Sequence, residues 1–174
     1  IEKLSPHKTS SPMKHLAYLS LGTNLGNKEE NLHAAMQLIK EQIGNIVSQS
    51  ALYVSAPWGF SSENSFLNNA VAVETTLNPS ELLQTTQDIE RALGRTHKTV
   101  SRQYSDRLID IDILFYDSLV MDTPTLTLPH PLLHQRLFVL SPLTEIAPTL
   151  RHPILQKTIR TLHLELLAKE ESPC

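Results

Sequence analysis

The stretch Leu108-Ile109-Asp110-Ile111-Asp112-Ile113-Leu114-Phe115-Tyr116 has the two-residue period of a β-strand and carries two acids inside an apolar run. The alternation predicts two opposite faces, one with Ile109, Ile111, Ile113 and Phe115 and the other with Asp110, Asp112, Leu114 and Tyr116. The strand therefore presents a pair of carboxylates on one face.

Three more strands are expected before this one. Residues 15–21 form an apolar run that stops at a loop, 22–26, and residues 46–54 and 66–74 have the composition of a second and a third strand.

Two helices separate these strands. One is expected between Asn27, which can cap its first turn, and Gly44, and the other between Asn78, followed by Pro79, and Gly94. The order strand, helix, strand, strand, helix, strand is typical of the ferredoxin-like fold. We therefore expect an α+β protein with a βαββαβ core and an antiparallel sheet. Both helices should cover one face and leave the other face for ligands.

The remainder of the chain adds smaller elements. Short extended pieces are expected near 119–121 and 126–128, one or two short helices within 131–147, and a longer helix near 158–168. The domain boundaries predicted from composition are a flexible lead-in at 1–14, one domain at 15–168 and a polar tail at 169–174.

Composition narrows the class of protein. The chain has 174 residues, 40% hydrophobic and 19% charged, which is a globular balance. Its one cysteine excludes an internal disulfide and a multi-thiolate zinc site. No apolar run approaches the roughly 20 residues of a membrane span, and a net charge of -3 argues against binding to nucleic acid. We therefore expect a soluble, cytoplasmic protein without membrane or nucleic-acid partners.

The acid pair suggests a metal site. Period two separates Asp110 and Asp112 by roughly 7 Å on one face, where their like charges need a cation. Mg²⁺ suits them because it binds through one or two carboxylates together with substrate phosphates. The alternative is an exposed sheet face with two solvated acids.

A basic segment precedes the acidic strand. Residues 91–107 contain five cationic side chains and one acid, Asp106; the cations are Arg91, Arg95, Lys98, Arg102 and Arg107. Guanidinium groups beside a paired-carboxylate strand are typical of phosphoryl transfer, although a solvated charged loop would have the same composition. No glycine-rich phosphate-binding motif is present in the sequence.

Three aromatic residues, Trp58, Phe66 and Phe138, can either pack in the core or sandwich a flat heterocycle. In the second case Asn68 would offer a donor–acceptor pair to the edge of that ring.

Other polar residues are ambiguous on pattern alone. Gln87 and Glu90 lie three apart on the second helix and face the same side, either toward a nucleotide or toward solvent. His130, after Pro129, has a structural role as its simplest interpretation.

Six blocks together resemble the 6-hydroxymethyl-7,8-dihydropterin pyrophosphokinase family. They are Leu21-Gly22-Thr23-Asn24-Leu25-Gly26, Phe66-Leu67-Asn68-Asn69-Ala70-Val71, Ile89-Glu90-Arg91 with Gly94-Arg95, Arg107 to Leu114, Leu128-Pro129-His130-Pro131, and Pro142-Leu143 with Glu145-Ile146-Ala147-Pro148. The resemblance runs from about Ala17 to Leu150.

The resemblance implies transfer of diphosphate from ATP to 6-hydroxymethyl-7,8-dihydropterin, giving AMP and the pterin diphosphate in folate biosynthesis. It implies that Asp110 and Asp112 bind two Mg²⁺ ions and act in catalysis with Arg95 and Arg107. The residues it places around ATP are Gln87, Glu90, Arg95, Arg107, Ile113, Thr127, His130 and Arg136. Those it places around the pterin are Ser55, Ala56, Pro57, Trp58, Gly59, Phe66, Asn68, Tyr104 and Phe138.

The sequence departs from the family pattern at Ser105-Asp106, where small residues are usual, and at Tyr104, where Trp is frequent. Alternatives are another two-metal phosphoryl-transfer enzyme or nuclease, and a ferredoxin-like nucleic-acid binder, which the acids of 108–116 disfavour. The chain can also be one domain of a fused folate-pathway protein.

Overall fold

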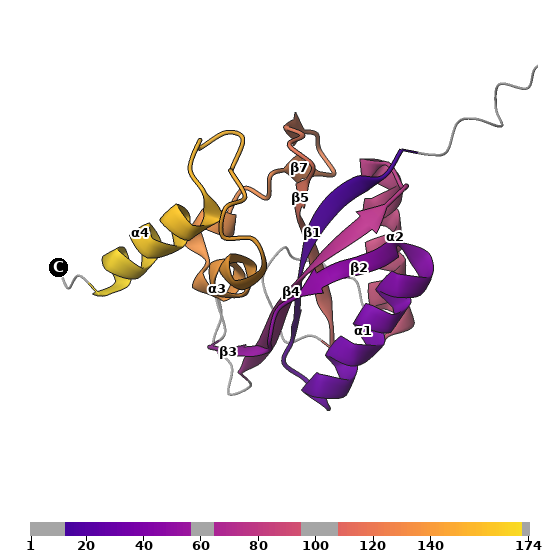
Figure 1. Ribbon diagram of the computed structural model, residues 1–174. Coiled ribbons are helices and arrows are strands. Elements are labelled where there is room, and N and C mark those ends of the chain that lie inside the picture. The colour runs from indigo at the N-terminus through magenta and orange to yellow at the C-terminus, as the bar shows by residue number, and fades with distance from the viewer. Residues whose placement is uncertain (1–12, 57–64, 95–107, 172–174) are drawn as a thin grey trace, which may run out of the picture.

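The computed structural model describes residues 13–56, 65–94 and 108–171 (Figure 1). In chain order its elements are β1 (His15–Thr23), α1 (Lys28–Gln42), β2 (Gly44–Gln49), β3 (Tyr53–Ser55), β4 (Phe66–Thr75), α2 (Pro79–Ala92), β5 (Asp110–Tyr116), β6 (Met121–Asp122), β7 (Thr127–Leu128), the 3-10 helix η2 (Leu133–Gln135), α3 (Leu137–Ile146) and α4 (Ile159–Glu171).

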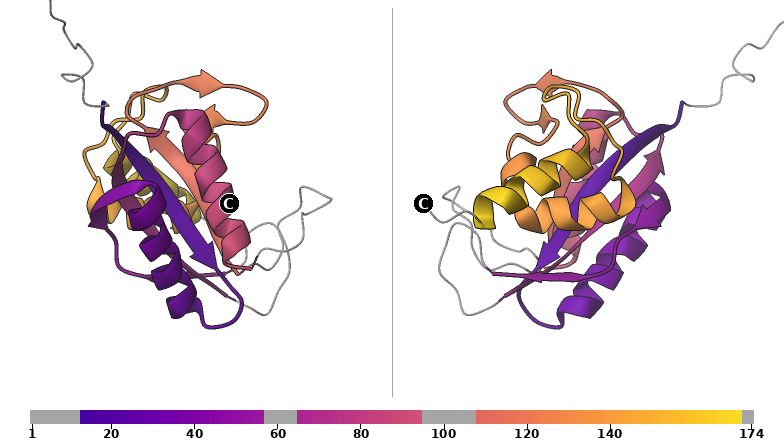
Figure 2. Two further views of the ribbon diagram at one scale, coloured as in Figure 1. Left: turned by 90° about the vertical axis from the view of Figure 1, so that its right-hand side faces the viewer. Right: turned by 60° about the vertical axis from the view of Figure 1, so that its left-hand side comes forward.

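The main sheet has the predicted ferredoxin-like order. Its strands run β2-β4-β1-β5, all neighbours are antiparallel, and β3 pairs with the end of β4. Helices α1 and α2 cover one face of this sheet, and α3 and α4 lie on the other side (Figure 2). The short strands β6 and β7 form a separate antiparallel pair.

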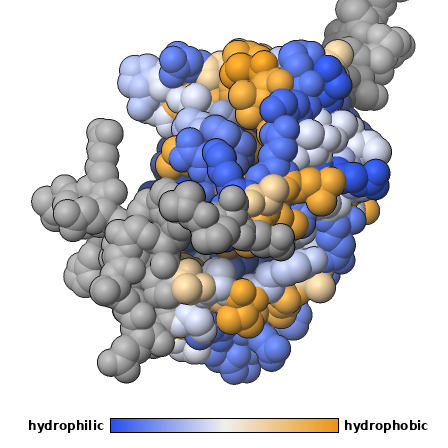
Figure 3. Space-filling model, turned by 90° about the vertical axis from the view of Figure 1, so that its left-hand side faces the viewer, coloured by the Kyte–Doolittle hydropathy of each residue, from blue (hydrophilic) through white to orange (hydrophobic). Residues whose placement is uncertain are grey.

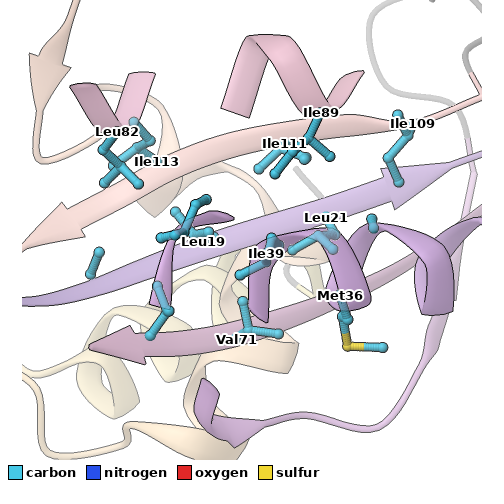
Figure 4. Close-up of a cluster of buried hydrophobic side chains, with 14 of the residues drawn as sticks. Leu19, Leu21, Met36, Ile39, Val71, Leu82, Ile89, Ile109, Ile111 and Ile113 are labelled. Atoms are coloured by element: carbon cyan, nitrogen blue, oxygen red, sulfur yellow. The ribbon is translucent and has the colours of Figure 1, made fainter. Parts of the chain in front are cut away.

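The core under α1 and α2 is continuous and apolar. Leu19 and Leu21 of β1 meet Ile39 of α1, Ile89 of α2 and Ile111 of β5 in this cluster (Figure 4). Burying each such side chain contributes about 1.5 to 3 kcal/mol. The expected alternation of β1 and β5 therefore builds the hydrophobic half of the domain.

Local signals in the sequence place both helix starts. The Asn27 side chain accepts from the Glu30 amide at 3.2 Å. At α2, Asn78 and Glu81 form a reciprocal capping box, with 2.8 and 2.9 Å between donors and acceptors. Each pair satisfies amides that the first helical turn leaves without partners.

We predicted that the second face of the sheet would be left open for ligands. Instead, α3 packs over much of it. Ala70 and Ala72 of β4 are buried on this side, and their small side chains let a helix approach. Phe115 joins Leu140 of α3 and Ile159 of α4 in a second core. Only the end of this face near Asp110 and Asp112 borders a cavity.

The predicted alternation of β5 fails at its end. The register of β1 and β5 shifts between Tyr18 and Leu19, which pair with Phe115 and Ile113 and leave Leu114 as an extra residue. Such a bulge inverts the alternation beyond it. Phe115 consequently joins the second core, and Tyr116 joins the first, opposite to our prediction.

The predicted strand 46–54 is interrupted. Between β2 and β3 the Ser50 amide still donates to the Ala70 carbonyl, but the Ala70 amide donates to the Ser50 hydroxyl, both at 2.9 Å. A side chain thus replaces one backbone acceptor, and β3 resumes pairing at Tyr53. A hydrogen bond of this kind is invisible in a hydrophobic pattern.

Two predicted boundaries also move. β1 continues through Thr23, so part of the expected loop 22–26 belongs to the strand, and α4 continues to Glu171, past the expected domain end at 168. Within the described ranges no helix has the length and apolar character needed to span a bilayer. On the face that Figure 3 shows, hydrophobic residues lie in separate patches among hydrophilic ones.

Candidate active site

A cavity opens at the end of the sheet where β1 and β5 lie beside β3 and the start of α3. Its empty volume is about 440 Å³. Its lining combines acids, small polar residues and aromatic rings: Ser20, Gly22, Ser55, Ala56, Phe66, Asn68, Asp110, Asp112, Arg136 and Phe138. We call the lining residues of β3 and β4 one wall of the cavity, those of the η2–α3 junction the other wall, and those of β1 and β5 its floor.

The acid pair lies on the floor of this cavity. In the register of the sheet, Gly22 is opposite Asp110 and Ser20 is opposite Asp112. Because these partners are small, the space beside both carboxylates stays open. Among the described residues no group of three or more His, Cys, Asp or Glu side chains could enclose a metal ion. Two carboxylates beside an open space fit Mg²⁺, which completes its shell with substrate oxygens and water.

The main chain between the two acids is held from behind. The amide of Ile111, which lies between Asp110 and Asp112, donates to the carboxylate of Glu90 on α2 at 2.8 Å. Glu90 is buried, whereas Gln87 one turn earlier is exposed. The structure therefore separates two residues that we expected to face the same side.

The amide of Asn68 has one defined orientation. Its Nδ2 donates to the Ser55 hydroxyl at 2.8 Å and to the Tyr53 carbonyl at 3.2 Å. Its Oδ1 lies toward β1, where a Cβ built on Gly22 would approach it to 3.0 Å. Asn68 thus turns its acceptor toward β1, while its amide nitrogen bonds within the protein. The donor–acceptor pair toward a ligand stays a prediction.

A cation and an aromatic ring form the opposite wall. Arg136 precedes α3 and is buried, and its guanidinium carbon lies 5.7 Å from the centroid of the Phe138 ring. Burial lowers the pKa of Arg136 to about 10, so the side chain still carries its charge at neutral pH. The cavity therefore contains positive charge on one wall and acids on its floor.

Five predicted ATP contacts do not line the cavity: Gln87, Glu90, Ile113, Thr127 and His130. Ile113 is part of the first core, and the Thr127 hydroxyl donates to the Asp122 carboxylate at 3.2 Å.

His130 lies behind the acid pair, after the cis peptide bond between Leu128 and Pro129. Its amide donates to the Leu114 carbonyl at 3.0 Å, and its Nδ1 accepts from the Leu132 amide at 3.1 Å. Burial lowers the pKa of His130, and the negative charge of Asp110 partly opposes this shift. The ring is neutral at pH 7 and carries its proton on Nε2, because Nδ1 is an acceptor.

Several predicted site residues lie outside the described residues: Pro57, Trp58, Gly59, Arg95, Tyr104 and Arg107. Ser20 and Gly22 line the cavity but were missing from the predicted site. The signal that could have found them is their size: on β1, two small residues alternate with the buried Leu19 and Leu21.

The family model described as 7,8-dihydro-6-hydroxymethylpterin-pyrophosphokinase (HPPK) matches residues 18–148. The chain belongs to this family. It is 45% identical over 139 residues to 2-amino-4-hydroxy-6-hydroxymethyldihydropteridine pyrophosphokinase of Porphyromonas gingivalis, a match that covers 79% of this chain and 94% of that protein. The Bacillus subtilis enzyme of the same name is 41% identical over 135 residues, covering 77% and 79%.

Longer proteins also contain this domain. Folic acid synthesis protein FOL1 of Dictyostelium discoideum is 38% identical over 157 residues, 90% of this chain but 23% of that protein. The crystal structure of Plasmodium falciparum HPPK-DHPS with pteroate matches with a TM-score of 0.77 and 18% identity. That match covers 94% of this chain and 47% of the other, so this HPPK chain spans about half of its length.

These matches confirm the predicted family, the α+β fold class and the class of reaction. The chain is a pyrophosphokinase of folate biosynthesis that uses ATP as co-substrate, and dependence on Mg²⁺ is a general property of its family.

Proposed function

We propose that diphosphate transfer from ATP to 6-hydroxymethyl-7,8-dihydropterin takes place in the cavity above Asp110 and Asp112. The observation that carries this proposal is the meeting of two kinds of residue in one cavity. The acid pair suits a metal-bound triphosphate, and Phe66, Phe138 and Asn68 suit the faces and edge of a flat polar ring.

Asp110 and Asp112 would hold Mg²⁺, two ions as the family resemblance implies. When bound, Mg²⁺ supplies positive charge against the phosphate oxygens. The protein's own part is to keep both carboxylates on one face of β5, and the Glu90 bond to Ile111 fixes the backbone between them.

The pterin would lie between the two walls of the cavity. Phe66 and Phe138 offer aromatic faces, and Asn68 Oδ1 accepts from an N–H at the edge of the ring. A base whose edge presents only acceptors there would meet a second acceptor and bind poorly. Arg136 on the far wall adds a fixed cation.

The remaining predicted contacts stay proposals. Arg95 and Arg107 would engage the triphosphate, and Gln87, Glu90, Ile113, Thr127 and His130 would lie around ATP. Pro57, Trp58, Gly59 and Tyr104 would complete the pterin pocket. Most of the rate enhancement should then come from positioning and electrostatic stabilisation. We also propose that the domain acts in the cytoplasm, and that it can function within a fused folate-pathway protein, as its longer relatives suggest.

The test is AMP formation from ATP and Mg²⁺, with and without the pterin, in the wild type and in Asp110→Ala. We expect pterin-dependent AMP in the wild type and a rate at least about 100-fold lower in the variant, as for loss of a group that stabilises transferring charge. Glu41→Ala is the matched control, because this exposed acid of α1 has, among the described residues, a single partner, the Gln37 amide that donates to it. Formation of ADP instead of AMP, or an Asp110→Ala variant as active as the control, would overturn the proposal.

A further inference from the structure

A tyrosine and a glutamate connect the two walls of the cavity at a distance from its lining. The Tyr53 hydroxyl of β3 donates to Glu145 Oε1 of α3 at 2.6 Å. The Ala51 amide, just before β3, donates to both carboxylate oxygens of Glu145, at 3.2 and 3.3 Å. The hydrogen bond to this carboxylate is the main cause that raises the pKa of Tyr53, which keeps its hydroxyl a donor throughout the neutral range.

Each partner belongs to an element that enters the cavity. Glu145 lies two helical turns after Phe138, so both residues lie on the same side of α3. Tyr53 lies two residues before Ser55 on β3, and Ser55 and Phe138 line opposite walls of the cavity. Figure 1 shows β3 beside α3, and the two elements are in contact. The Tyr53–Glu145 bond therefore sets the spacing of the two walls.

The same tyrosine also contacts Asn68 of β4 through its backbone. Its carbonyl accepts from Asn68 Nδ2 at 3.2 Å, and Ser55 accepts from the same nitrogen at 2.8 Å. A movement of β3 away from α3 would therefore turn the Asn68 amide as well as widen the cavity. Neither Tyr53 nor Glu145 lines the cavity itself.

Among the described residues, β3 is held mainly by its pairing with β4 and its contact with α3. It is three residues long, it pairs with β4 on one side, and Ser50 interrupts its connection to β2. Short edge strands with few buried contacts open at low cost in free energy.

We propose that Glu145 is a positioning residue for the pterin substrate: through Tyr53 it fixes the wall formed by β3 and the orientation of Asn68. This inference rests on the proposed placement of the pterin in the cavity. It assigns no contact between Glu145 and either substrate. Its effect should appear in the pterin KM and leave the ATP KM nearly unchanged, since the acids that handle the phosphates lie on β5.

Four variants test this role: Glu145→Ala, Tyr53→Phe, the double variant, and Glu145→Gln. Steady-state KM values for the pterin and for ATP are measured with the Tm of each protein. We expect Tyr53→Phe to raise the pterin KM by about tenfold, the effect of losing one charge-assisted hydrogen bond. Glu145→Ala should raise it at least as much, because it also removes the acceptor of the Ala51 amide. The double variant should be no worse than Glu145→Ala, because that change already removes the bond that Tyr53→Phe removes. Glu145→Gln should restore most of the affinity, since its amide oxygen still accepts from Tyr53.

Glu165→Ala is the control for loss of an exposed carboxylate, because Glu165 on α4 bonds only to Lys157 among the described residues. An unchanged pterin KM in Glu145→Ala, an equal rise in both KM values, or additive effects in the double variant would overturn the positioning role. A fall in Tm that accounts for the loss of activity would do the same. Failure of the proposed function would look different, because the wild type itself would then form no pterin-dependent AMP.

Discussion

The two faces of the main sheet are built from the same strands and have different roles. Toward α1 and α2, the side chains of β1, β4 and β5 are apolar and fully packed, with Leu19, Val71 and Ile113 among them. Toward α3, the same strands present Ser20, Asn68 and Asp112 to a cavity. Successive residues of each strand thus alternate between the two faces, so that one packs in the hydrophobic core and the next lines the cavity.

The division is not complete along the second face. At one end Ala70, Ala72 and Phe115 pack under α3 and α4, and at the other end the polar residues border the cavity. The helix that closes the second core therefore also supplies one wall of the site. A change on the first face should affect stability alone, whereas a change near α3 can affect both.

The largest expected effect is on the first face. Ile39→Ala removes a fully buried side chain of α1 and should lower the free energy of unfolding by about 2 to 5 kcal/mol. Both KM values should stay within about twofold of the wild type well below the Tm, because no strand of the site moves. Urea denaturation and steady-state kinetics measure the two quantities, with Ile39→Val as the milder control. A raised pterin KM would show that the two faces are coupled.

The opposite result is expected at Gly22 on the second face. In Gly22→Ala the new methyl group would lie 3.0 Å from Asn68 Oδ1, the acceptor that we propose for the pterin. We expect the pterin KM to rise by about tenfold, a change of about 1.4 kcal/mol. The stability should be unchanged or slightly higher, because alanine loses less backbone entropy in a strand than glycine does. A strong loss of stability with normal kinetics would contradict this view of Gly22.

Asn69 is a buried polar residue on the first face. It is fully buried, its Nδ2 lies 3.5 Å from the Met36 sulfur, and its Oδ1 has no hydrogen bond within the described structure. Asn69→Val should raise the free energy of unfolding by about 1 kcal/mol, since it removes an unsatisfied buried acceptor. The kinetics should not change. A lower stability by urea denaturation would mean that the buried amide is satisfied in solution.

The smallest expected effect is the loss of stability at low pH. Burial, aided by the nearby charge of His134, lowers the pKa of His152. The His152 ring packs edge-on against Phe115 of the second core. The unfolded chain, with the ordinary pKa near 6.5, then binds the proton more readily than the folded chain. This contribution to stability is fully present above pH 6.5 and is lost as the pH falls below it. The same sign holds for His163 between α3 and α4.

The Tm should therefore fall between pH 7.5 and pH 5.5. In His152→Asn the dependence should be weaker, because the amide oxygen can replace Nδ1 as acceptor from Ile154 and Leu155 but cannot take up a proton. Hydrogen exchange at the lower pH should show α3 and α4 opening before α1 and α2. Simultaneous opening of all four helices would remove the contrast between the faces.

The sequence was most informative where neighbouring residues determine the structure. Asn78 and Pro79 predicted the start of α2, and the alternation of 108–113 predicted two acids on one face. Both predictions follow from neighbouring residues alone. Residue chemistry indicated Phe66, Asn68 and Phe138, and the family resemblance added Ser55, Ala56 and Arg136; the structure brings all six into one cavity.

The features that could not be predicted depend on contacts between distant segments. The bulge at Leu114 is set by pairing with β1, and the break before β3 by a serine hydroxyl that bonds to β4. The cover over the second face needs α3, which follows β4 by more than sixty residues. Ser20 and Gly22 went unnoticed because small residues show no chemistry until their neighbours are known.

The bond between Glu90 and the Ile111 amide has a consequence outside catalysis. Among the described residues β5 is the last strand in the order of the sheet, and the unpaired amides of an edge strand can serve as a template for another chain. Glu90 occupies one of these amides at the middle of the edge and puts a carboxylate where an incoming strand would need a carbonyl. A residue that steadies the acid pair thereby also discourages the enzyme from aggregating through its own active-site strand.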